Sequence, residues 1–178
     1  MSAAALSRAQ RLLGDAVLST SSFRGDDTLV VKAEKIASVL KTLRDDNDLA
    51  MDFLVDLTAV DRFALGLKDG EARFEVVYHL RSMKSGARLR VKAPLQDVLT
   101  ADGGVDPLSA PELDSVVPLW PGANWYEREV YDMFGIHFRG HPDPRRILLY
   151  EEFIGYPLRK DYPKERRHPL VRRDGSEV

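Results

Sequence analysis

Three segments in which apolar and polar residues alternate constrain the fold of this chain more than any other feature. They span residues 51–60, 73–81 and 87–93. The side chains predicted to face inward are Met51, Phe53, Val55, Leu57 and Ala59 in the first segment, Phe74, Val76, Tyr78 and Leu80 in the second, and Leu89 and Val91 in the third. A period of two predicts half-buried strands, because successive side chains of a strand point to opposite faces.

The second and third segments are separated by only a few polar residues, 82–86, which predicts an antiparallel hairpin. Pro94 is expected to end the third strand, since proline cannot donate to the ladder. Helical periodicity comes earlier, in residues 3–14 and 33–45, and a short strand is expected between them at 28–32, after a polar turn. Together these elements predict an α+β fold: a small mixed or antiparallel sheet with helices packed on one face.

A further helix is predicted at residues 124–134. Asn124 is the expected N-cap, Glu127 stands at the capping-box spacing, and Gly135 supplies the left-handed residue that commonly ends a helix. The apolar stripe of this helix consists of Tyr126, Val130, Met133 and Phe134. The stripe by itself predicts core packing.

The charge distribution and the prolines divide the chain into three parts. These are a platform domain (1–106), a linker with the signature helix (107–138), and an extended Pro/Arg-rich C-terminal docking arm (139–178). Basic residues outnumber acidic ones in the arm, but they are interleaved with aromatic and aliphatic residues that a disordered tail would lack. Its prolines favour an extended chain that loses little entropy on docking. We therefore expect the arm to bind a neighbouring subunit.

Candidate chemistry is scarce. The chain has no cysteine, which excludes disulfides and cysteine-ligated clusters. It has no Gly-x-Ser-x-Gly elbow and no phosphate-binding glycine loop, so no catalytic residue and no cofactor site are predicted. His137 and His141 are four residues apart but follow Gly135 and flank Gly140, where a helix that would align them as metal ligands is not expected.

Composition favours a soluble chain without a membrane span. No run approaches the roughly 18 apolar residues that a span needs, and the N-terminus lacks the pattern of a secretory signal. The net charge of −2 argues against general nucleic-acid binding. The basic pairs in the arm nevertheless leave a free-standing anion- or nucleic-acid-binding protein as an alternative.

Three consecutive stretches carry a family resemblance. They are EREVYDMFGI at 127–136, GHPDPRRIL at 140–148 and GYPLRKDYP at 155–163. In residues and spacing they closely resemble the 30-kDa subunit family, also known as the C subunit, of the proton-pumping NADH–quinone oxidoreductase, respiratory complex I. The chain departs from the pattern at Pro144, where a large aliphatic residue is usual, and at Tyr156, where histidine is frequent.

The resemblance implies a non-catalytic structural subunit of the peripheral arm of this translocase, which transfers electrons from NADH to quinone and couples this to proton translocation. Flavin, iron–sulfur clusters and quinone are then expected in partner subunits. The implied partners are the hydrogenase-like large subunit at the quinone site and neighbouring iron–sulfur subunits. The implied location is the cytoplasmic face of the bacterial inner membrane, held there through the complex. The equivalent subunit of a membrane-bound hydrogenase or formate hydrogenlyase-type complex is the nearest alternative.

The charged and aromatic residues of the motif are candidates for the partner interface. They are Glu127, Arg128, Glu129, Asp132, His141, Asp143, Arg145, Arg146, Arg159, Lys160, Asp161 and Tyr162. We expect the four on the helix to orient the arm through ion pairs. The arginines and the lysine of the arm are expected to pair with partner carboxylates, because arginine forms bidentate pairs with them.

Overall fold

The computed structural model describes residues 2–67, 71–97, 111–163 and 165, with side chains from residue 5 onward. Its main sheet has five strands in the order β1-β2-β5-β4-β3. The strands are β1 (Val17–Phe23), β2 (Asp26–Val31), β3 (Phe53–Asp61), β4 (Phe74–Arg81) and β5 (Arg88–Leu95). Neighbouring strands are antiparallel except β2 and β5, which are parallel. The predicted mixed α+β fold is confirmed.

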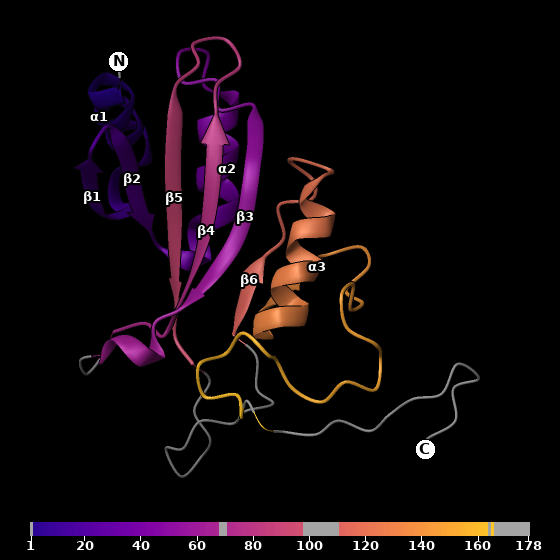
Figure 1. The fold of residues 1–178 in the computed structure, drawn as a ribbon. Coiled ribbons are helices and arrows are strands. Elements are labelled where there is room, and N and C mark those ends of the chain that lie inside the picture. The colour runs from indigo at the N-terminus through magenta and orange to yellow at the C-terminus, as the bar shows by residue number, and fades with distance from the viewer. Residues whose placement is uncertain (1, 68–70, 98–110, 164, 166–178) are drawn as a thin grey trace.

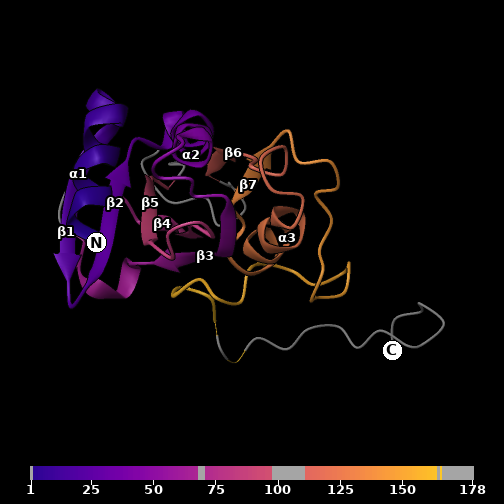
Figure 2. The same ribbon diagram turned by 90° about the horizontal axis from the view of Figure 1, so that it is seen from above.

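Two helices, α1 (Ser2–Leu13) and α2 (Ile36–Asp45), cover one face of this sheet (Figures 1 and 2). Short 3-10 turns lie at Gly14–Ala16, Ala33–Lys35 and Phe63–Leu65. The core fills the space between the helices and the sheet. Its buried side chains include Leu29, Val31, Ile36, Val39, Leu40, Leu43, Phe74, Val76, Tyr78, Leu80, Leu89 and Val91. The inward faces predicted for residues 73–81 and 87–93 are thus confirmed.

The predicted inward face of β3 is partly wrong. Phe53 and Val55 are exposed, whereas Leu54, Leu57 and Ala59 are buried. The pairing of β3 with β4 shifts register between Leu54 and Asp56, as at a β-bulge. An extra residue reverses which side chains face inward, so strict alternation cannot hold across it.

Strand β1 was not predicted, and Pro94 does not end β5. The sequence of β1, VLSTSSF, has little apolar alternation because this edge strand is mostly exposed. It turns into β2 through Arg24 and Gly25, both at positive φ (52° and 88°), as in a tight hairpin. Pro94 lies inside β5, opposite Glu75. The pairing of β5 with β2 reaches only to Lys92, so no ladder bond on that side needs the missing N–H.

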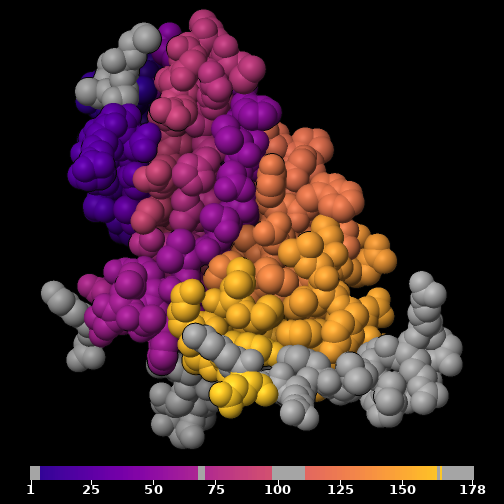
Figure 3. Space-filling model, in the orientation of Figure 1, coloured from indigo at the N-terminus to yellow at the C-terminus, as the bar shows by residue number. Residues whose placement is uncertain are grey.

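The second part of the fold stands beside β3. Strands β6 (Glu112–Asp114) and β7 (His137–Arg139) form a small parallel pair, and α3 (Ala123–Phe134) packs against β3 (Figure 1). The chain after β7 runs down along α3 and returns beneath the lower end of the sheet, where it forms part of the molecular surface (Figure 3). The predicted boundary between residues 106 and 107, and the arm from 166 onward, lie outside the described residues. Within the described part of the chain, no helix is both long and apolar enough to cross a membrane.

Candidate functional site

The start of α3 differs from the prediction. Gly122 precedes the helix and no side chain caps it, so the predicted Asn124 cap and Glu127 capping box are wrong. The turn that leads into the helix explains why. The N–H groups of Ala123, Asn124 and Trp125 already donate to carbonyls three residues back, which leaves little for a capping side chain to do. At the other end, Gly135 adopts φ 72° and its N–H donates to the carbonyl of Tyr131, which confirms the predicted helix end.

Glu127 is fully buried and faces the segment after β6. Its carboxyl group accepts hydrogen bonds from the Ser115 hydroxyl and the Val116 N–H, both at 2.7 Å. Burial raises the pKa of Glu127 to about 7, and these two bonds oppose the rise only in part. His141 Nε2 lies 3.9 Å from the carboxylate but interacts with the carbonyl of Asn124 at 3.1 Å. Glu127 therefore joins α3 to the segment that follows β6.

Asp132, also fully buried, organises the chain after Arg145. Its carboxylate accepts a hydrogen bond from Arg146 at 2.6 Å and from the backbone N–H groups of residues 147, 148 and 149 at 2.8–3.1 Å. Burial alone would raise the pKa of Asp132, but these donors lower it below its usual value. The arrangement is an anion-binding turn whose anion is supplied by the helix.

Arg128 binds the backbone at the start of the same turn. Its guanidinium donates to the backbone carbonyls of Arg145 and Arg146 at 3.0 Å, and it lies 3.5 Å from Asp143. Arg145 itself is exposed and pairs with Asp143 at 2.6 Å. Glu129 is exposed on the helix.

Tyr156 and Arg159 lock the later part of the arm onto the end of α3. A Cβ atom at Gly135 would lie 2.4 Å from the Tyr156 ring, so only glycine permits this contact. Arg159 Nε donates to the carbonyl of Phe134 at 2.6 Å, and its guanidinium lies over the ring of Tyr156. Burial lowers the pKa of Arg159, and the nearby Arg73 acts in the same direction.

A second anchor, not predicted from the sequence, ties the arm to the sheet. Arg73 is buried and pairs with Asp61 at 2.9 Å, Asp97 at 2.8 Å and Asp161 at 2.7 Å. The backbone N–H of Lys160 also donates to Asp61 at 2.8 Å. Burial opposes the charge of Arg73, but the three carboxylates raise its pKa above the usual value. No local sequence pattern predicts this cluster, because Arg73 and Asp161 are 88 residues apart.

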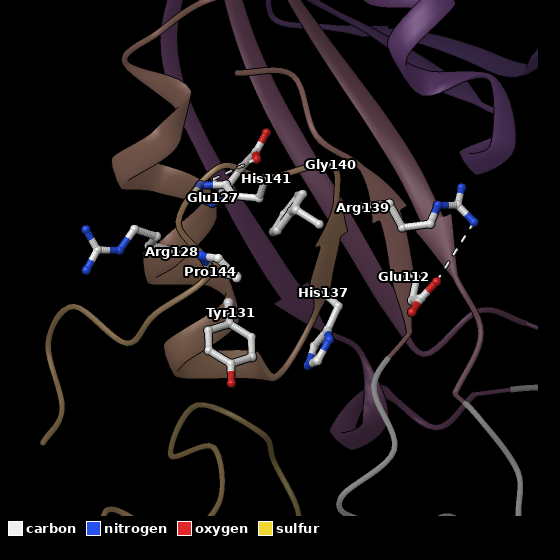
Figure 4. Close-up of a pocket in the computed structure, with 10 residues that line it drawn as sticks. Glu112, Glu127, Arg128, Tyr131, His137, Arg139, Gly140, His141 and Pro144 are labelled. Carbon is white, nitrogen blue, oxygen red and sulfur yellow. Dashed lines mark ion pairs between the residues drawn. The ribbon is translucent and has the colours of Figure 1, made fainter. Parts of the chain in front are cut away.

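A cavity of about 390 Å³ opens between α3 and β7 (Figure 4). Its walls include Tyr131, His137, Phe138 and Pro144, with Glu127 and His141 side by side at one end. The guanidinium of Arg128 points away from it (Figure 4). In the described part of the chain, no group of three or more histidine or acidic side chains could hold a metal ion.

The twelve predicted interface residues thus do not form one outward-facing site. Eight have their charged groups bonded within the chain: Glu127, Arg128, Asp132, Asp143, Arg145, Arg146, Arg159 and Asp161. Tyr162 stacks on Phe153, and its hydroxyl reaches the carbonyl of Ile154 at 3.4 Å. Contacts of the exposed members, such as Arg145 and Lys160, with another subunit remain predictions.

Comparison with known proteins agrees with the motif and the fold. The family described as "Respiratory-chain NADH dehydrogenase, 30 Kd subunit" matches residues 29–168. The chain belongs to this family. It is 47% identical to the C subunit of NADH-quinone oxidoreductase from Citrifermentans bemidjiense over 149 residues, which cover 84% of this chain and 81% of that protein. Identity to the protein of the same name from Roseiflexus sp. (strain RS-1) is 44%, over 90% and 83% of the two chains. These matches confirm the family predicted from residues 127–163.

The fold is also found in a chain of the membrane-bound sulfane sulfur reductase, described as an archaeal respiratory membrane complex. The TM-score is 0.66 with 24% identity, and the match covers 90% of this chain and 84% of that one. At this identity the likeness concerns the fold alone.

Proposed function

We propose that this chain is a non-catalytic structural subunit in the peripheral arm of a NADH–quinone oxidoreductase. In that complex, electrons pass from NADH to quinone through other subunits, and their transfer is coupled to proton translocation. The observation that carries the proposal is the 43–47% identity to several proteins named as the C subunit of NADH-quinone oxidoreductase over most of the chain.

The chemistry around α3 supports a structural role. Its most buried charged groups, those of Glu127, Asp132 and Arg159, bond to backbone or hydroxyl groups of the chain itself. Side chains used in this way position segments and are not available to a substrate. The chain also lacks the cysteines that hold iron–sulfur clusters. We therefore assign flavin, clusters and quinone to partner subunits.

The arm supports a place beside other subunits. We place the chain next to the hydrogenase-like large subunit and neighbouring iron–sulfur subunits, on the cytoplasmic face of the inner membrane. No segment of its own is required to enter the membrane in this arrangement, because the partners hold the chain there.

Deletion and complementation test the proposal. Removing the gene is expected to abolish NADH-dependent quinone reduction in isolated membranes, and a plasmid copy is expected to restore it. The purified chain is expected to show no flavin or iron–sulfur absorbance. Unchanged quinone reduction in the deletion strain would contradict the proposal. Loss of membrane hydrogenase activity instead would assign the chain to the alternative complex.

A further inference from the structure

Two of the four cations in residues 143–162 turn inward, whereas three aliphatic side chains of the same segment face outward. Arg146 and Arg159 are mostly buried, and their donors are used within the chain. Leu148, Ile154 and Leu158, in contrast, are 62%, 46% and 45% exposed. We call these three side chains the apolar ledge.

The ledge is held in place although its segment contains no helix or strand. The N–H of Leu148 is bound by Asp132, and the N–H of Leu158 donates to the carbonyl of Met133 at 3.1 Å. Between them, Phe153 stacks on Tyr162 and meets Tyr150 edge to face. Fixed in this way, the segment loses little conformational entropy when a partner covers it.

The charges around the ledge indicate which kind of surface covers it. Residues 143–162 contain four acidic and four basic residues, so the segment has no net charge. An anionic membrane or a nucleic acid would be attracted by a basic excess, which residues 143–162 lack. An apolar centre with a balanced polar rim is the anatomy of a protein–protein interface.

We propose that the apolar ledge is the contact through which the arm docks onto a complementary apolar surface of a neighbouring subunit. This rests on the proposed function, which supplies the neighbouring subunits. Ion pairs within the arm then serve to shape the ledge, and burial of Leu148, Ile154 and Leu158 provides the attraction. The partner surface is expected to be a shallow apolar depression and not an acidic groove.

The test compares variants of the tagged full-length chain expressed in a strain that lacks its own copy. Membranes are solubilised in detergent, the chain is captured, and the co-purifying subunits are quantified. Leu148→Ser combined with Ile154→Ser is expected to lower their recovery at least tenfold. Met83→Ser is the matched control, because Met83 is 66% exposed but lies in the β4–β5 turn, at the far end of the sheet from the arm. This control is expected to recover the wild-type amount.

Thermal unfolding of each isolated chain separates docking from folding. The double variant is expected to unfold within about 2 °C of the wild type, since exposed positions contribute little to stability. If the double variant is folded and still recovers the wild-type amount of subunits, the docking role of the apolar ledge is wrong. The proposal would also be contradicted if the isolated wild-type chain formed a homodimer, or bound anionic phospholipid vesicles, and the double variant did not. If the wild-type chain captures no subunits, the proposed function fails before the ledge is tested.

Discussion

Glu127 and Asp132 are both fully buried acids on one helix, but their surroundings act on them in opposite directions. Glu127 has two donors and no cation in hydrogen-bonding contact, and burial raises its pKa. Asp132 has three backbone N–H groups and the Arg146 guanidinium, which together lower its pKa. At neutral pH Asp132 is therefore a fixed charge, whereas Glu127 is close to its titration point.

The first prediction concerns the pH dependence contributed by Glu127. Its folded-state pKa of about 7 lies above the ordinary value of 4.5, so protonation favours the folded state. Its stabilising contribution is complete below pH 4.5 and is lost as the pH rises through 7. Between pH 4.5 and 8 the wild type should lose on the order of 3 kcal/mol more unfolding free energy than Glu127→Gln, which does not titrate there. Urea unfolding across this range measures the difference. Parallel profiles would show that Glu127 does not titrate in this way.

The second prediction concerns Gly135. Gly135→Ala forces an alanine into φ 72° and places its Cβ against the Tyr156 ring. Gly140 is the control, because its φ is 79° but nothing lies within 4 Å of a Cβ there. Gly140→Ala should cost about 1–2 kcal/mol from the backbone alone. Gly135→Ala should cost at least ~1 kcal/mol more in chemical denaturation. Equal costs would mean that the Tyr156 contact contributes nothing.

At the scale of elements, α3 is the support on which the following segment folds. It contributes Asp132 to the turn at 147–149, Arg128 to the carbonyls of residues 145 and 146, and its C-terminal carbonyls to Leu158 and Arg159. Much of the motif sequence is accounted for by these intramolecular bonds. An extended arm that folds only on a partner would not need them.

The third prediction follows from this support. Asp132→Asn removes the charge that compensates Arg146 and should cost about 3–5 kcal/mol. Because Asp132 holds the turn at 147–149, the substitution should loosen this part of the arm before the rest of the chain unfolds. Trypsin should therefore cleave after Arg145 and Arg146 at least tenfold faster than in the wild type. Asp143→Asn weakens the exposed pair with Arg145 and the longer 3.5 Å pair with Arg128, and should change stability by less than about 1 kcal/mol. Equal cleavage rates in the two variants would contradict the role given to Asp132.

Sequence patterns predicted the elements with strong periodicity and missed those without it. Strands β4 and β5 alternate clearly, and their inward faces were predicted correctly. Strand β1 carries no such signal, and the bulge after Leu54 is a local backbone event that hydropathy does not record. The capping prediction for Glu127 was wrong, because a backbone turn had already satisfied the helix N-terminus.

For the whole molecule, the motif predicted the family. Which side chains of the motif face the interior and which face solvent could be seen only in the structure. The Arg73–Asp161 pair joins positions 88 residues apart, and periodicity carries no information on such a contact. The same holds for Arg145 and Arg146, which are neighbours in sequence. One is exposed, and the other pairs with buried Asp132 at 2.6 Å.

Separate charge reversal of these two arginines tests most directly whether the motif charges shape the arm or bind the partner. For each variant, the unfolding free energy of the isolated chain and the recovery of co-purifying subunits are measured together. Arg146→Glu is expected to lower the unfolding free energy by about 3–5 kcal/mol, since it leaves Asp132 buried beside a like charge. Arg145→Glu, whose side chain is 73% exposed, is expected to change neither quantity appreciably. A stable Arg145→Glu chain that captures no subunits would contradict the account, because an exposed charge would then be the docking contact.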